Sequence, residues 1–229
     1  MTDWAAYFAE NAANQMPIDW ACHYRLTEAE IGCVLRSIQQ FQLGESSEGV
    51  HLIQRAERYA QHRQDTAYLP ALRAFIAEEQ RHAAYLARFL RQQNLPLIEH
   101  NWVDSVFRRL RRLATLEVSV VVLITAEIIA VTYYKALHDV TQSLTLQHIC
   151  RQILHDEIKH LAFQRQTLDQ LRVRRSRVMC GLGMRLHRLL FAGTLLIVWW
   201  QHGKVYRAAG SNLFNFWQRN WTRFNHTFA

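Results

Sequence analysis

The sequence predicts an all-α protein, and three observations support this fold class. Half of the 229 residues are hydrophobic, yet there are only 8 Gly and 3 Pro, a composition that suits long helices with few corners. Apolar residues recur at intervals of three and four over long stretches. No run of β-branched residues alternates with polar ones between turn signals, as strands require. A chain of this length can bury a sizeable core as one domain.

The first half of the chain predicts an arm followed by two helices. Residues 1–26 carry scattered aromatic side chains without a long period and are expected to lie on the bundle as an N-terminal arm. Thr27 is followed by acidic residues in the next turn, which is typical of a helix start. From there an apolar stripe predicts a first helix over about 27–62. A second helix is expected over about 66–93.

The second half predicts three more helical regions. A basic connection over 94–116 leads to a third helix over 113–137. After a turn at 139–143 a fourth helix runs to about 171, and a fifth helical region over 178–208 precedes an aromatic tail. We therefore divide the chain into the arm (1–26), a four-helix bundle (27–171) and a C-terminal helix with an aromatic tail that packs on the bundle (172–229).

Two Glu-x-x-His pairs suggest a metal site. Glu79 precedes His82 by three positions, and Glu157 precedes His160 by three. Residues at i and i+3 lie on one face of a helix, so both side chains can reach one metal ion. A single pair is weak evidence, because chance nearly supplies one in a chain with 12 His. A third pair begins at Glu48, but its histidine, His51, is better explained as a core or surface residue.

Lone glutamates on the predicted buried faces complete the pattern. Glu127 lies in the most apolar part of the third helix, and its midpoint with Glu157 is position 142, inside the predicted turn. Glu48 and Glu79 have their midpoint at 63.5, at the edge of the turn before the second helix. Antiparallel helices joined by these turns would bring each pair to one height. Glu45, one turn earlier, is the alternative ligand to Glu48.

The residues Glu48, Glu79-x-x-His82, Glu127 and Glu157-x-x-His160 resemble the ferritin-like di-iron carboxylate superfamily. The resemblance covers residues 28–170 and is nearest to the aldehyde-deformylating oxygenases and the soluble acyl-carrier-protein desaturases. It implies a four-helix bundle with a long crossover between helices 2 and 3, and two iron ions bridged by Glu79 and Glu157. In this superfamily the acid before one motif often orients the histidine of the other. Asp156 is therefore the expected partner of His82, and Glu78 that of His160.

Four carboxylates and two histidines suit iron or manganese better than zinc. We expect two iron ions, with Mn/Fe or Mn/Mn as alternatives. The resemblance implies an oxidase or oxygenase that uses O2 and an external electron donor to oxidise an apolar substrate. By helical phase Tyr85 is the tyrosine best placed for a radical or hydrogen-bonding role. Core packing is the alternative for Tyr85, and also for Tyr133 and Tyr134.

Two other functions stay open from the sequence. One is iron handling, as a ferroxidase or a peroxide-detoxifying protein, although the chain has no C-x-x-C segment of the rubredoxin type. The other is a non-catalytic helical protein attached to a membrane surface through its Trp-rich tail. A protein without bound iron or manganese would favour this non-catalytic alternative over the oxidase or oxygenase.

The charge of +8 favours acidic partners, either an acyl carrier protein or an anionic membrane surface. Two clusters carry much of it, residues 108–112 and 172–177, and neither accompanies a nucleic-acid motif. Four scattered cysteines and no export signal predict a cytoplasmic protein, peripheral to a membrane if it binds one, and a homodimer is compatible. Two apolar stretches, 118–134 and 189–200, are expected to be buried helices rather than membrane spans.

Overall fold

A computed structural model describes residues 2–100 and 115–229, and within them the chain is helical with no strand. The predicted all-α class is confirmed. The helices are α1 (Trp4–Ala13), α2 (Glu28–Glu45), α3 (Val50–Arg63), α4 (Tyr68–Gln92), α6 (Leu116–Val140), α7 (Leu144–Arg172), α8 (Arg177–Ala208) and α9 (Leu213–Phe228).

Polar caps fix where most of these helices begin. Thr27 forms a capping box with Glu30 at the start of α2, so each residue satisfies a backbone N–H of the other. At the starts of the later long helices a hydroxyl accepts a hydrogen bond from the backbone N–H three residues on. These caps are Thr115 before α6, Ser143 before α7 and Ser176 before α8.

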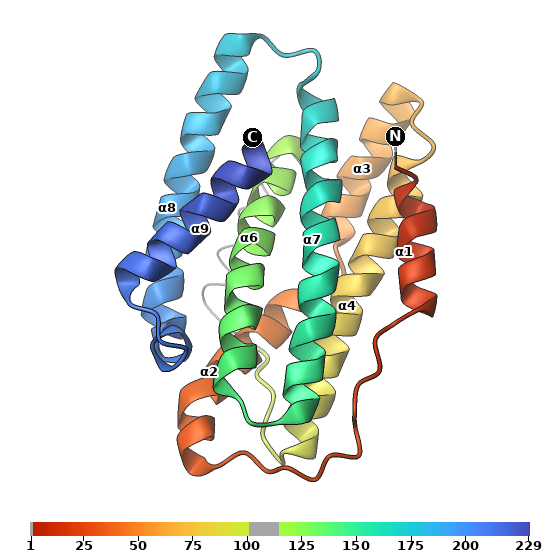
Figure 1. Cartoon of the computed structure of the whole chain (residues 1–229). Helices are drawn as coiled ribbons and strands as arrows, with labels where there is room; N and C mark the ends of the chain where they lie inside the picture. Colours follow the sequence, from red (N-terminus) through yellow and green to blue (C-terminus); the bar gives the residue numbers. More distant parts are fainter. Residues whose placement is uncertain (1, 101–114) are drawn as a thin grey trace.

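Two helical hairpins form the centre of the molecule. In one, α2 and α3 together pack against α4, and in the other α6 packs against α7. Contacts of α4 with α7 and of α3 with α6 join the hairpins. Figure 1 shows α4 and α6 running in the same direction, so the connection between them joins opposite ends of the bundle. Most of it, residues 101–114, lies outside the described residues, including the basic cluster 108–112.

The first helix of the bundle is interrupted, which corrects the expected continuous helix over 27–62. Helix α2 ends at Glu45 and α3 begins at Val50. Gly49 has φ +63°, and a Cβ there would lie 2.6 Å from Cδ1 of Ile76. A left-handed backbone and close contact with α4 both favour glycine at this position. The apolar stripe resumes after the break, so periodicity alone does not reveal it.

Helix α6 is the most deeply buried element. Tyr133 and Tyr134 are fully buried, and Phe41 of α2 stacks on Tyr133 with ring centroids 3.6 Å apart. A further buried aromatic group forms where α1, α4 and α7 meet. Its members are Phe8, Phe75 and Phe163, whose ring centroids are 5.5 to 6.3 Å apart.

The ends of the chain cover two sides of this core. Helix α1 packs on α4, while α8 packs on α2 and α6, and α9 packs on α6, α7 and α8 (Figure 1). Within the described residues, α6 and α8 are long and apolar enough to cross a membrane. The α6 segment is 72% buried, as expected, but the α8 segment is only 22% buried. The prediction of a buried helix at 189–200 is thus wrong for one face of α8.

Candidate metal centre

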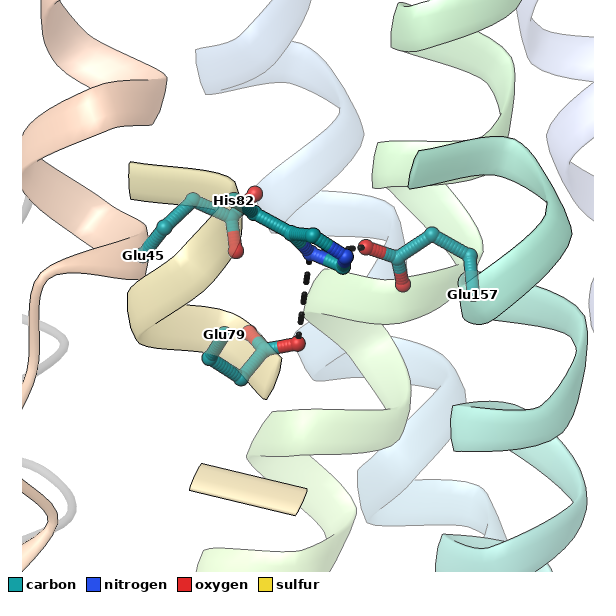
Figure 2. A group of neighbouring side chains, drawn as sticks. All are labelled: Glu45, Glu79, His82 and Glu157. Atoms are coloured by element: carbon teal, nitrogen blue, oxygen red, sulfur yellow. Dashed lines mark ion pairs between the residues drawn. The ribbon is translucent and has the colours of Figure 1, made fainter. Parts of the chain in front are cut away.

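Six side chains that can bind metal meet between the hairpins. They are Glu45 at the end of α2, Glu79 and His82 on α4, Glu127 on α6, and Glu157 and His160 on α7. They form two groups of four, and within each group one ligand atom per residue lies within 4.8 Å of the others. Figure 2 shows the group with Glu45 and His82, and the second contains Glu127 and His160. Glu79 and Glu157 belong to both.

Helical spacing explains how so many polar groups converge. Each Glu-x-x-His pair projects two side chains from one face of α4 or α7. His160 Nδ1 lies 2.9 Å from Glu79, 3.6 Å from Glu157 and 3.9 Å from Glu127. His82 Nδ1 lies 3.9 Å from both Glu79 and Glu157. In both histidines, Nδ1 therefore faces the shared carboxylates.

The atoms that face one another have no hydrogen-bond partners, although buried polar atoms normally do. They are Glu79 Oε1, His82 Nδ1, Glu127 Oε1, both oxygens of Glu157, and His160 Nδ1. The 2.9 Å approach of His160 to Glu79 does not have hydrogen-bond geometry. Carboxylate oxygens and imidazole nitrogens left unpaired around one space are the donor set that two metal ions require. The residues present therefore fit such a pair of ions.

The outer nitrogens of both histidines have carboxylate partners, and they are the two expected from the sequence. His82 Nε2 lies 2.9 Å from Asp156 Oδ2. His160 Nε2 lies 2.9 Å from Glu78 Oε2. The Nε2 atom of each histidine thus contacts a carboxylate of the other hairpin. A proton held at Nε2 leaves the Nδ1 lone pair free for a metal.

Asn11 on α1 contacts both of these carboxylates, and no sequence motif marks it as a site residue. Its Nδ2 donates to Glu78 Oε1 at 2.7 Å and to Asp156 Oδ1 at 2.8 Å. Arg81 also donates to Glu78 at 2.7 Å, and Gln152 to both oxygens of Asp156. Asn11 is buried on a short helix with no metal-binding motif, so only the three-dimensional packing identifies it.

Burial sets unusual proton affinities in the centre. It raises the pKa of Glu45 and of Glu127 well above the usual value, and the neighbouring charges of Glu79 and Glu157 raise both further. Burial also acts to raise the pKa of Glu79, but His160 lowers it below the usual value. For His160, burial acts to lower the pKa, but Glu79 and the other carboxylates raise it well above the usual value.

Glu45, rather than Glu48, belongs to the centre, which corrects the preferred ligand from the sequence. Glu48 and Glu79 would lie at one height only if the helix were continuous, whereas α2 ends at Glu45. The break turns Glu48 to the exposed surface, and His51 is exposed as well. Glu45 is buried and faces Glu79 in the group of Figure 2.

The tyrosine that touches the centre is Tyr134, not Tyr85. The Tyr134 hydroxyl donates to Glu45 Oε1 at 2.7 Å from a fully buried position. The Tyr85 hydroxyl donates instead to Gln15 at 3.2 Å, and its ring packs near Trp20. Tyr133 packs against Phe41 in the core.

A small cavity reaches the centre beside the break between α2 and α3. Its volume is about 40 Å³, and both Glu45 and Glu79 line it together with Gly44, Ser47 and Gly49. The Glu79 side chain is 18% exposed. The interrupted helix therefore leaves room beside two of the candidate ligands, enough for a molecule of the size of water.

Comparison of the chain with protein-family models, with curated proteins and with solved structures finds no match.

Proposed function

We propose that the chain is a ferritin-like di-metal carboxylate protein that uses O2 to oxidise an apolar substrate. The observation that carries this proposal is the pair of overlapping four-residue groups that share Glu79 and Glu157. Two helices each supply a Glu-x-x-His pair and two others each supply one glutamate, as in di-iron helix bundles. The unpaired, mutually facing ligand atoms support the same assignment.

In this proposal Glu79 and Glu157, which belong to both groups, would serve two ions. Glu45 and His82 would help to hold one ion, and Glu127 and His160 the other. An oxygen-rich set with one imidazole per ion favours iron or manganese over zinc, which prefers four tetrahedral ligands. When bound, iron would supply the redox chemistry for reaction with O2, and the electrons consumed would have to come from an external donor.

The chain's own residues would then control charge, geometry and access. Asp156 and Glu78 hold the histidine rings with Nδ1 facing inward. The Tyr134 hydroxyl, 2.7 Å from Glu45, can donate a proton toward that carboxylate or hold it in place. Apolar residues of α6 around Glu127, among them Leu123, Ile124 and Ile128, exclude water from the neighbouring core. This apolar setting favours an apolar substrate.

The cavity favours a second candidate, an iron-oxidising protein without an organic substrate. Its volume of about 40 Å³ admits water or O2 to Glu45 and Glu79 but not an aliphatic chain. Oxygen consumption that depends on added Fe(II), continues without any organic compound and leaves iron bound as oxide would favour this candidate. Substrate-dependent consumption would favour the oxygenase.

Metal content of matched variants tests the assignment. Wild-type protein reconstituted anaerobically with Fe(II) should hold two irons per chain by elemental analysis. Glu45→Gln and Glu127→Ala should each lose at least one iron, and His160→Ala should lose Fe-dependent O2 consumption. Glu48→Gln is the control, since its side chain is exposed only three residues from Glu45. Two irons in all of these variants, or loss only in Glu48→Gln, would refute the proposal.

A further inference from the structure

Helix α8 presents a long apolar stripe to solvent. Five aliphatic side chains and one tryptophan on its outer face are 57% to 82% exposed. They are Val178, Leu182, Leu186, Leu189, Leu196 and Trp200. Figure 1 shows α8 at the edge of the molecule. Isolated exposed leucines are ordinary, whereas a contiguous row of this size on a soluble domain marks an interaction surface.

The stripe is one geometric face of the helix. Its members recur at intervals of three, four or seven residues, so they share one side of α8 over about 33 Å at 1.5 Å per residue. The opposite side holds α8 on the bundle. There Phe191 and Leu195 are fully buried, and His202 Nδ1 lies 2.7 Å from the Ser37 hydroxyl of α2. The helix is therefore apolar on both sides but attached through only one.

The segment that contains the stripe carries basic residues and no acidic residue of its own. All 19 acidic residues of the chain lie at or before Asp169, whereas ten of the 27 Lys and Arg residues follow it. Exposed basic side chains precede the stripe, flank it and follow it along α8. They are Arg174 and Arg177, then Arg185 and Arg188, then Lys204 and Arg207. The whole positive excess of the protein thus belongs to the part that contains the stripe.

We propose that the outer face of α8 docks on a membrane surface of anionic phospholipids, with the helix lying in the plane of the interface. The stripe enters the boundary between headgroups and acyl chains, and the arginines reach the phosphates. This orientation keeps the buried face on α2 and α6, whereas a membrane span would strip that face from the bundle. A dimer through the stripe would bring together two acid-free segments of like charge.

Vesicle binding by the full-length protein tests this surface. In flotation assays the protein should bind vesicles of phosphatidylcholine with 30% phosphatidylglycerol at least tenfold more tightly than pure phosphatidylcholine vesicles. Added salt should weaken this binding. The double variant Leu182→Gln/Leu189→Gln should reduce it at least tenfold, and so should Arg174→Gln/Arg177→Gln. Leu144→Gln is the control, because Leu144 is a half-exposed apolar residue at the start of α7.

Other results would overturn the proposal. Equal binding to neutral vesicles would show that the arginines do not recognise acidic lipids. A dimer in sedimentation velocity that the Leu182→Gln/Leu189→Gln variant dissociates, with no vesicle binding, would identify the stripe as a subunit interface. Resistance to extraction by alkaline carbonate would indicate a span. Membrane docking does not depend on metal, so Glu127→Ala should bind vesicles as the wild type does.

Discussion

At the scale of single residues, the geometry of the candidate centre depends on side chains outside the six candidate ligands. Asp156 and Glu78 orient the two histidines, and Asn11 holds both acids from a third direction. Low-dielectric surroundings make such a network sensitive to the loss of one member. The charge-assisted hydrogen bonds of Asn11 also connect the docking of α1 to the geometry of both histidines.

Replacing Asn11 should weaken metal binding without removing a ligand. We expect Asn11→Ala to raise the dissociation constant for Fe(II) or Co(II) about 10–100-fold, since outer partners of metal ligands typically contribute that much. Competitive titration with a chromophoric chelator measures the change. Asn14→Ala is the matched control, because Asn14 is exposed at the end of the same helix. Equal affinities in the two variants would show that Asn11 only packs.

Glu127 should make the metal-free protein sensitive to pH. Its folded-state pKa lies well above the usual value because of burial and the charges of Glu157 and Glu79. A carboxyl with a raised folded pKa keeps its proton longer in the folded state, so stability falls as pH rises above the ordinary value near 4.3. Glu45 and His160, with raised pKa values, act in the same direction. Asp156 and Glu79, whose pKa values are lowered, oppose it at acidic pH.

The variant Glu127→Gln separates this effect from metal binding. Because its amide carries no charge, the metal-free variant should be more stable than the wild type at pH 8 and should differ little at pH 4. Urea unfolding of both proteins after chelation measures the difference. An equal loss of stability at both pH values would instead indicate a packing defect.

At the scale of elements, the break between α2 and α3 determines which glutamate reaches the centre. Where the other long helices begin followed more closely from the sequence, since Thr27 was the expected start of the first helix and α7 begins just after the expected turn at 139–143. The break between α2 and α3 could not be predicted in this way, since the apolar stripe resumes beyond it. The left-handed conformation of Gly49 and its contact with Ile76 arise from packing on α4, which periodicity does not report. For the same reason, the sequence favoured Glu48 over Glu45 as the metal ligand.

Two glycine substitutions test that account of the break. Gly49→Ala places a Cβ at φ +63° and 2.6 Å from Ile76, so we expect a loss of about 1–2 kcal/mol or more in unfolding free energy. Gly32→Ala, inside α2 with nothing within 4 Å of the new Cβ, should gain about 0.5–1 kcal/mol. Denaturant unfolding measures both. A neutral Gly49→Ala would mean that the break does not need glycine.

At the scale of the whole molecule, the acidic residues and the net positive charge belong to different parts of the sequence. The candidate metal centre and every acidic residue belong to the first 169 residues, and the positive excess belongs to α8, α9 and the segments beside them. The sequence indicated the two Glu-x-x-His pairs, the lone Glu127 and the all-α class. It could not indicate which side of α8 is exposed, because that helix is apolar around much of its circumference.

The most direct test of the central claim is an anomalous-scattering map of crystals of the iron-loaded protein, recorded at the iron edge. The account predicts two peaks between the hairpins, one bound by Glu45 and His82, the other by Glu127 and His160, with Glu79 and Glu157 contacting both. A single peak, no peak, or iron bound at Glu48 and His51 would contradict it.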